Sequence, residues 1–303
     1  MMTGSLAAHR MLVRELKKLR ERAGVPVKTA CQAIQVAPQT FWRMEAGQSR
    51  PTAKELYVGI LCELYGATDA VTGHLTTLAT EARKPDQWCS FRDIIPEHLT
   101  LLITLEETAQ RVTTFQPDLI PDLLRTAEYQ HAITPVEFPD HTPDDLEQML
   151  DLLELRQARL HTDTELEFQA LLCETALRNP VGGPEVMADQ LHHLATLGDR
   201  PNVSIRIVPE YAGCHAGMTT GSFTSMEFPT HPTSHLTEPP LVYVPCATGA
   251  HYLDDDSAVT RYRAAISGIR RVALDETASR QLLLEIMHER RNSDRPAAVG
   301  GAA

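Results

Sequence analysis

The stretch Val25–Gly47 decides how the N-terminal part of this chain folds, and it reads VPVKTACQAIQVAPQTFWRMEAG. In its first half, small and apolar residues recur at helical spacing, at Ala30, Ala33 and Ile34. Val36 then interrupts that phase. Pro38 follows, a residue that suits the first turn of a new helix because its missing N–H costs nothing there. The stretch therefore predicts two short helices joined by a tight turn.

The second of these helices has its apolar face at Phe41 and Met44, and Gly47 can end it. Two short helices that cross on small residues form a helix-turn-helix motif. Around the motif, apolar stripes and capping residues predict further helices over residues 9–23, 52–65 and 69–84. We therefore expect a five-helix domain over residues 9–84.

This segment resembles the xenobiotic-response-element (XRE) family of helix-turn-helix regulators, which are similar to phage repressor DNA-binding domains. The residues that carry the resemblance are Val36, Thr40, Phe41, Arg43, Met44, Glu45 and Gly47. The resemblance implies that the second helix of the motif enters the major groove of DNA. Base-edge contacts are then expected from Gln39, Thr40 and Arg43. Phosphate contacts are expected from Lys28 and Arg50.

Five positions depart from the family pattern. Pro26 and Val27 stand where the family has a capping residue and an amide that contacts DNA. Gln35 stands where the turn has glycine, and Ala37 replaces the cap of the recognition helix. Trp42 replaces a small polar residue on the face that would meet DNA. These changes leave the fold intact but put DNA affinity in question. An alternative therefore stays open, in which the motif is only a scaffold in a helical bundle.

The whole chain carries a net charge of −12, which is unusual for a DNA-binding protein. The charge is unevenly distributed. Residues 1–66 hold ten Lys and Arg against five Asp and Glu, whereas residues 67–303 hold eighteen against thirty-five. A basic patch on a small domain is what contact with phosphate requires. The alternative is a solvated helix face, because one predicted helix carries Arg14, Lys17, Lys18, Arg20 and Arg22 on its polar side.

Composition also bears on the compartment. The sequence contains no run of eighteen apolar residues, and its start lacks the apolar stretch of a signal peptide. Its six cysteines are scattered without a CxxC pair, which suits a reducing compartment. The length of 303 residues allows one or two domains, and a break at residues 84–86 predicts a linker between two. We expect a cytoplasmic protein with no membrane partner.

Beyond that linker, we predict a second domain over residues 90–291. Helical spacing predicts helices over residues 96–114, 121–131, 143–160, 184–197, 257–274 and 275–290. Alternating or short apolar runs predict strands over residues 165–171, 203–207, 223–228, 241–244 and 251–253. The fold class is therefore α+β and mostly helical, with the second domain's helices packed on a small mixed sheet. Residues 292–303 are rich in Pro, Gly and Ala, so a disordered tail is expected.

The second region resembles actinobacterial regulators of the WhiJ type, which join an XRE motif to a long antitoxin-like C-terminal domain. The matching stretches are residues 115–121, 123–129, 174–187, 201–203, 227–229 and 252–255. One departure is Asp122, where the family has glycine. The resemblance implies a cytoplasmic homodimer that takes a small partner protein or a small-molecule ligand. It implies no catalytic site.

Several short motifs suggest chemistry, but each has a simpler structural explanation. Cys214 with His215, and His192 with His193, do not supply four zinc ligands at workable spacing. A Cys–His nucleophile at Cys214 would also need an orienting group. The acids at 254–256 precede a predicted helix, where they act as caps. The sequence holds no Walker loop and no dinucleotide fingerprint. We therefore predict no metal site, no cofactor and no catalytic residue.

Residues 209–250 form the best candidate for a ligand site. This region is rich in Gly, Thr, Ser, His and Pro and lies between predicted strands. Long segments of this kind are often functional. The residues predicted to line a pocket are Glu174, Tyr211, His215, Met218 and Tyr243. Each of them also has an ordinary structural explanation.

Together these observations predict a DNA-binding transcription regulator whose C-terminal domain binds a ligand or partner and dimerises. Two alternatives stay open. In the first, DNA binding has decayed and the chain is a ligand-binding protein or a biosynthetic enzyme. The departures from Pro26 to Trp42 are the observation behind it. In the second, the C-terminal domain is an antitoxin-like module that holds a small partner protein.

Overall fold

The computed structural model describes residues 5–45, 55–84, 88–91, 93–163, 165–230 and 237–293. The chain divides into two compact units. The first, here called the helical unit, comprises Met1–Arg92, Leu99–Thr108 and Pro229–Glu238. The second, here called the sheet unit, comprises Asp93–His98, Ala109–Phe228 and Pro239–Ala303.

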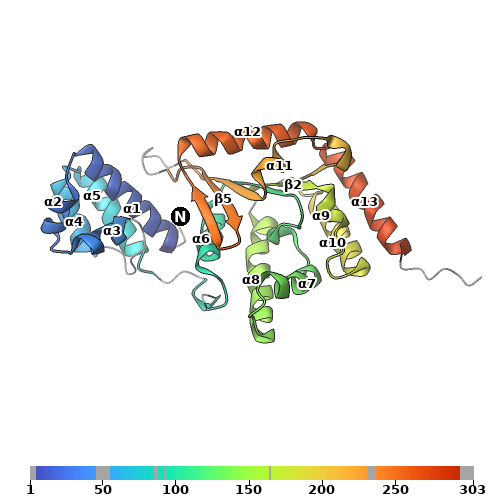
Figure 1. Ribbon diagram of the computed structural model, residues 1–303. Coiled ribbons are helices and arrows are strands. Elements are labelled where there is room, and N and C mark those ends of the chain that lie inside the picture. Colours follow the sequence, from blue (N-terminus) through green and yellow to red (C-terminus); the bar gives the residue numbers. More distant parts are fainter. Residues whose placement is uncertain are drawn as a thin grey trace, which may run out of the picture. The chain divides into compact units, whose positions relative to one another are not determined.

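The described part of residues 1–92 contains the five predicted helices, drawn from blue to cyan in Figure 1. They are α1 (Ser5–Arg22), α2 (Val27–Ala33), α3 (Pro38–Glu45), α4 (Glu55–Leu64) and α5 (Asp69–Glu81), followed by the 3-10 turn η1 (Cys89–Phe91). Their core is apolar and closely packed around Leu12, Ala30, Ile34, Phe41, Leu61 and Leu75. Helix α1 begins at Ser5, earlier than predicted, because the buried Ala8 continues its apolar stripe. Helix α6 (Glu97–Thr108) supplies residues 99–108 of the same unit.

The turn between α2 and α3 depends on one residue in the left-handed region. Gln35 has φ +55, and among the described residues it is the one non-glycine residue with positive φ. A side chain with a Cβ is strained there. The backbone nevertheless closes the turn, because Val36 N donates to Cys31 O at 3.0 Å. The motif thus folds even though the usual glycine is missing.

The sheet unit is built on a six-stranded mixed sheet with the order β3-β2-β1-β4-β5-β6. The strands are β1 (Arg111–Gln116), β2 (Glu167–Cys173), β3 (Val203–Val208), β4 (Phe223–Glu227), β5 (Leu241–Cys246) and β6 (Gly249–Leu253). Strands β1, β2 and β3 are parallel, whereas β4, β5 and β6 join the sheet antiparallel. The predicted fold class, helices packed on a small mixed sheet, is confirmed.

The sequence prediction was wrong at β1. A helix was expected over residues 96–114, but α6 ends at Thr108 and Arg111–Gln116 forms an inner strand of the sheet. Val112, predicted to lie on a helix, pairs with Phe168 on one side and Met226 on the other. The run Val-Thr-Thr-Phe explains the difference, because β-branched and aromatic residues favour a pleated, buried strand over a helix.

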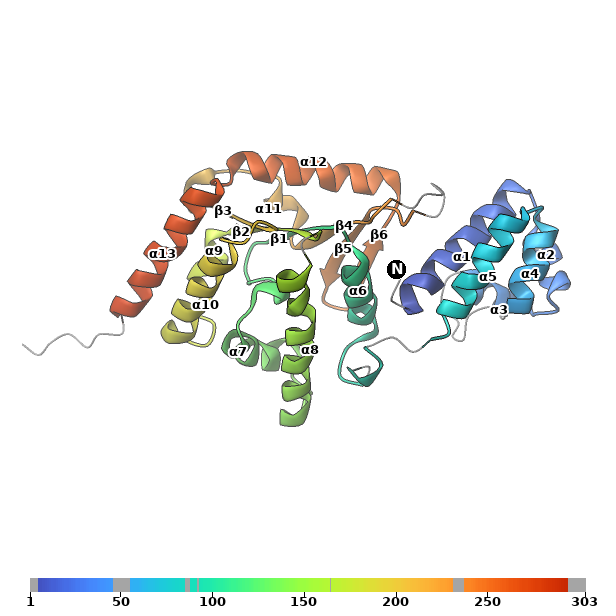
Figure 2. The same cartoon turned by 180° about the vertical axis from the view of Figure 1, so that it is seen from behind.

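Helices cover both faces of this sheet (Figures 1 and 2). They are α7 (Ala127–Glu137), α8 (Pro143–Thr162), α9 (Glu174–Arg178), α10 (Pro184–Leu197), α11 (Gly217–Thr220), α12 (Asp256–Val272) and α13 (Glu276–Ser293), with 3-10 turns η2 (Asp122–Leu124) and η3 (Glu210–Ala212). Helix α12 packs Ile266 and Ile269 on one face, against Phe115, Phe223 and Val242. Helices α7 and α8 lie on the opposite side of the sheet (Figure 2).

Helix boundaries in the sheet unit follow capping chemistry. Thr142 and Asp145 form a reciprocal capping box at the start of α8. Asp255 caps α12 by accepting from Ala258 N at 2.9 Å, as expected of an acid before a helix. Helix α13 continues to Ser293, two residues into the predicted tail. The rest of that tail, residues 294–303, lies outside the described residues.

Candidate functional site

Helix α3 presents a polar face that is free of packing. Phe41 is 2% exposed and anchors α3 in the core of the helical unit. Gln39, Thr40 and Arg43 are exposed. Gln39 and Arg43 are four residues apart, so they share one side of the helix. The structure therefore brings the three predicted base-contact residues together on one short, accessible helix.

Trp42 lies on the same side of α3, three residues after Gln39 and next to Arg43. Its side chain is 58% exposed. An aromatic side chain of this size buries much apolar surface when it finds a partner. The departure from the family pattern at this position is therefore on the presented surface and has no role in the core.

An ion pair fixes the C-terminal end of α3 against α1. The Arg20 guanidinium donates to both oxygens of Glu45, from Nε at 2.6 Å and from Nη2 at 3.1 Å. Arg20 Nη1 also donates to Val25 O at 3.3 Å. The hydrogen bond to Glu45 raises the pKa of Arg20, against the lowering effect of burial. This bidentate geometry holds the helix in one orientation.

The basic run of α1 is largely used inside the unit. Arg14 Nη1 lies 2.8 Å from Glu238 Oε2, and Lys18 Nζ lies 3.2 Å from Glu15 Oε1. Together with Arg20, these cations serve internal pairs and are less available to phosphate. Within the described part of α1, α2 and α3, the cations that form no ion pair are Lys17, Arg22, Lys28 and Arg43. Arg50, the second predicted phosphate contact, lies outside the described residues.

The motif helices begin without the side-chain caps that the family uses. Pro26 precedes α2 and makes no side-chain capping bond. Its carbonyl oxygen instead accepts from Thr29 N at 3.0 Å and from Ala30 N at 3.2 Å. At α3, Ala37 O accepts from Phe41 N at 3.1 Å. Backbone bonds thus start both helices, and the departures at Pro26 and Ala37 leave the motif folded.

The five predicted pocket residues do not converge. Glu174 is buried, and its carboxylate accepts from Arg178 Nε at 2.7 Å and from Glu210 N at 3.1 Å. It therefore ties the turn after β3 to the end of β2. Tyr243 is 6% exposed and packs edge-on against Tyr252. Tyr211 and Met218 are 81% and 67% exposed, respectively.

The fifth residue, His215, lines a groove of about 1150 Å³ between α12 and the segment 214–220. Its Nδ1 accepts from Gly217 N at 3.2 Å, and its ring meets Phe115 edge-on at 6.1 Å between centroids. Gly217 is required for this packing, because a Cβ there would lie 2.3 Å from the Phe115 ring. On the α12 side, the lining residues include Ala258, Arg261, Tyr262, Ala265, Gly268 and Arg271.

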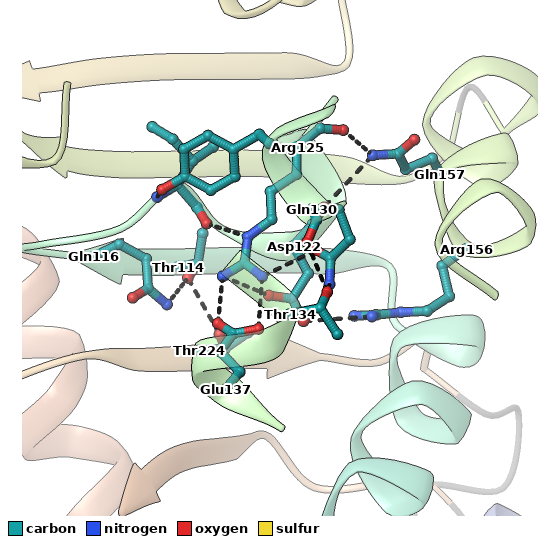
Figure 3. A network of polar contacts seen from close by, with 12 residues as sticks. Thr114, Gln116, Asp122, Arg125, Gln130, Thr134, Glu137, Arg156, Gln157 and Thr224 are labelled. Atoms are coloured by element: carbon teal, nitrogen blue, oxygen red, sulfur yellow. Dashed lines mark hydrogen bonds and ion pairs between the residues drawn. The ribbon is translucent and has the colours of Figure 1, made fainter. Parts of the chain in front are cut away.

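Figure 3 shows a polar network around Arg125, a buried residue that sequence reasoning did not single out. Its Nε donates to Ile120 O at 2.8 Å. Its two terminal nitrogens donate to the Glu137 carboxylate at 3.0 and 2.9 Å, and Nη1 also donates to Gln130 at 3.0 Å. Asp122, the departure from the family's glycine, lies 3.3 Å from Nη2.

Every nitrogen of the Arg125 guanidinium is engaged by the protein itself. Burial lowers the pKa of Arg125, but the carboxylates of Asp122 and Glu137 outweigh it, so that the net shift is upward. Burial likewise raises the pKa of Asp122, and the charges of Arg125 and Arg156 outweigh it in the downward direction. The network therefore holds the 120–126 segment against α7 and α8 and leaves no Arg125 nitrogen for a ligand. In the sequence, the stretch 123–129 is distinguished only by its resemblance to regulators of the WhiJ type.

Two further observations concern metals and membranes. Within the described ranges, no group of three His, Cys, Asp or Glu side chains could hold a metal ion. Asp255, from the acidic run before α12, is occupied by Ser257 Oγ at 2.7 Å and by Ala258 N. Among the described helices, none has both the length and the apolar character that a membrane crossing needs.

Comparison with known families gives two matches. Residues 11–75 match a family described as a helix-turn-helix domain. Residues 99–285 match a family described as a domain of unknown function, DUF5753. No curated protein and no solved structure matched the chain. Because the second match spans more than half of the 303 residues, the chain belongs to the DUF5753 family, and a helix-turn-helix domain precedes that family's domain.

Proposed function

We propose that this chain is a transcription regulator that reads operator DNA with α3. The observation that supports this most directly is that one side of α3 is fixed in the helical unit while the other side is exposed. Phe41 and the Arg20–Glu45 pair fix α3 in the helical unit, while Gln39 and Arg43 project together from its exposed side. Helix-turn-helix domains read base edges with residues placed in this way on the second motif helix.

Each exposed residue has a role that follows from its chemistry. Gln39 can form two hydrogen bonds with adenine, and Arg43 can form two with guanine. The Thr40 hydroxyl can hydrogen-bond to either base. Lys28, at the start of α2, and Arg50, which follows α3 in the sequence, would contact phosphate. We propose an XRE-like regulator of the WhiJ type that acts in the cytoplasm as a homodimer. Its two motifs would meet half-sites about one helical turn apart, roughly 34–36 Å.

The test is selection of binding sites by the full-length chain from a random double-stranded DNA library, followed by titration of the selected site. We expect a near-palindromic sequence and an affinity that falls steeply with salt, because phosphate contacts release counterions. Absence of any binding at about 50 mM salt, where non-specific contact persists, would overturn the regulator proposal. It would favour the alternative in which DNA binding has decayed, for which the exposed Trp42 on the reading face is the supporting observation.

For the sheet unit we propose a sensing role. The supporting observation is the groove of about 1150 Å³ beside α12. Small-molecule sites are concave and carry a few placed polar groups on an otherwise apolar lining. Residues such as His215 and Arg261 supply polar groups between alanines and a glycine on this lining. An antitoxin-like partner protein is the rival occupant, and a pull-down with the full-length chain from native cells would identify it.

A further inference from the structure

Most of the described arginines of the sheet unit bond to other groups of the protein. The sequence after residue 84 contains no lysine, so arginine supplies the permanent positive charge of this unit. Arg111 and Arg263, for example, pair with Glu227 at 2.9 Å, and Arg206 donates to three backbone carbonyls. Among the described residues of the unit, two exposed arginines form no ion pair and no side-chain hydrogen bond. They are Arg261 and Arg271, and both line the groove beside α12.

Both unpaired arginines rise from α12. They are ten residues apart on α12, which is about 15 Å along the helix axis. Gly268 lies between them. A Cβ placed on Gly268 would lie 3.8 Å from Arg271 Nη2 and 3.5 Å from the Ala216 Cβ. The Arg271 guanidinium therefore folds back over Gly268, toward the stretch of the groove that Arg261 borders.

The opposite wall adds a hydrogen-bond donor. His215 Nδ1 accepts from Gly217 N, so in the neutral ring the proton is on Nε2. The one carboxylate among the described lining residues is Asp255, which caps α12 and whose Oδ1 accepts from Ser257 Oγ and Ala258 N, so the two arginines outnumber the acid on this lining. The groove thus offers two guanidinium groups without an ion pair and an imidazole N–H, whereas the unit's other described arginines bond within the protein.

We propose that this groove binds a small polyanion, with phosphate or carboxylate groups held by Arg261 and Arg271. Arginine recognises both kinds of anion through paired, charge-assisted hydrogen bonds. A multiply charged ligand fits better than a single small ion, because the arginines rise from positions about 15 Å apart. The groove, at about 1150 Å³, is also slightly larger than the usual range of small-molecule sites, about 300–1,000 Å³, so it has room for more than a single small ion. The inference deepens the sensing role proposed above and rests on it.

The test is calorimetric titration of the full-length chain with inorganic pyrophosphate and, separately, with citrate, at constant ionic strength. The two arms distinguish a phosphate ligand from a carboxylate ligand. We expect at least one anion to bind with one site per chain. Arg261→Gln and Arg271→Gln should each weaken that binding by about tenfold or more. Gly268→Leu keeps both charges but fills the groove, so it should also prevent binding, while its thermal unfolding shows that the chain is folded.

Arg263→Gln is the matched control. It removes the same charge from the same helix, but Arg263 pairs with Glu227 and does not line the groove. It should leave anion binding unchanged. The proposal is overturned if neither anion binds, or if Arg263→Gln weakens binding as much as Arg261→Gln does. It is also overturned if Arg43→Ala abolishes binding, since the anion would then occupy the helical unit. The titration contains no DNA, so a negative result leaves the proposed operator binding standing.

Discussion

Two regions of the sheet unit differ in whether their arginine side chains are paired within the protein. Around Arg125, carboxylates, an amide and a carbonyl use every guanidinium nitrogen, and the side chain is 4% exposed. Along the groove, Arg261 and Arg271 are exposed, and no described residue bonds to them. The first arrangement stabilises a fold, because a buried charge must be fully compensated. The second leaves binding capacity for something outside the chain.

The helical unit shows the same contrast over a shorter distance. Arg20 is occupied by Glu45 and sets the position of α3, whereas Arg43 on α3 itself projects without an ion pair among the described residues. Internal pairing therefore separates the arginines that position an element from those that the element presents. Net charge alone misses this distinction, because the chain is acidic overall.

The largest expected effect tests the structural side of this comparison. Replacing Arg125 with methionine leaves the buried Ile120 O without its donor, and it removes the cation from the Glu137 carboxylate, whose side chain is 27% exposed. Breaking a fully buried pair from one side costs about 3–5 kcal/mol of unfolding free energy, and because the remaining carboxylates are partly hydrated we expect a loss near the lower end of that range. Urea unfolding of the full-length chain measures it.

Arg280→Met is the matched control, because Arg280 pairs with Asp199 at the surface, where both side chains are about half exposed. Exposed pairs contribute only about 0–1 kcal/mol. If both variants lose the same small amount, Arg125 is not the centre of a buried network. Anion binding in the groove should survive in whatever fraction of Arg125→Met remains folded.

The second effect concerns the exposed side of the comparison in the helical unit. Arg43→Ala should lose roughly 1–3 kcal/mol on the selected operator and relax one base position, because a bidentate base contact is removed. Its unfolding free energy should stay the same. Lys28→Ala should weaken all DNA sequences alike and reduce the salt slope by about one. Titration of matched and single-mismatch sites separates these results. Equal, sequence-blind losses would show that Arg43 contacts phosphate only.

Features whose stabilising contacts lie within one short stretch of sequence could be predicted, whereas features that depend on contacts between distant stretches could not. The helix-turn-helix was predictable because Ala30, Ile34 and Phe41 carry its core within one short stretch. Strand β1 was missed because its stability comes from β2 and β4, which lie far along the chain. The mixed sheet was still recovered from the alternating residues of the remaining strands.

The sites show the same limit. Gln39, Thr40 and Arg43 could be placed together because helical spacing alone puts them on one side of α3. The groove could not be predicted, because α11 and α12 form it from segments some forty residues apart and its width depends on Gly268. Glu174 and Tyr243, two of the predicted pocket residues, do not line this groove, for a related reason. Polar residues near a loop are often consumed by local bonds, and Glu174 holds η3 in this way.

A smaller effect is expected at the turn that leads into α3. Gln35 has a left-handed backbone, which costs about 1–2 kcal/mol for a residue with a Cβ. Glycine removes that strain, but it lowers the unfolding free energy by about 0.5–1 kcal/mol because it increases the conformational entropy of the unfolded chain. Gln35→Gly should therefore gain roughly 0.5–1 kcal/mol in unfolding free energy. Gln32→Gly, in the helical part of α2, should lose stability instead. A loss in both variants would mean that the turn is not strained.

The smallest expected effect concerns His193, a half-buried histidine. It extends the comparison to a protonated side chain that has no carboxylate partner among the described residues. Burial lowers the pKa of His193 on α10, and the charges of His161 and His192 lower it further. Arg125 differs because carboxylates surround it. Since the folded-state pKa of His193 lies below its ordinary value of 6.5, the unfolded chain binds more protons between those two pKa values. Stability should therefore fall as the pH drops through 6.5, and the contribution of His193 should level off below its folded-state pKa.

His193→Gln should flatten this pH dependence of the unfolding free energy, measured by urea unfolding between about pH 7 and pH 5. His131→Gln, on the exposed side of α7, is the control for losing a histidine. If the unfolding free energy of His193→Gln depends on pH as steeply as that of the unmodified chain, burial does not disfavour the protonated imidazole at this position.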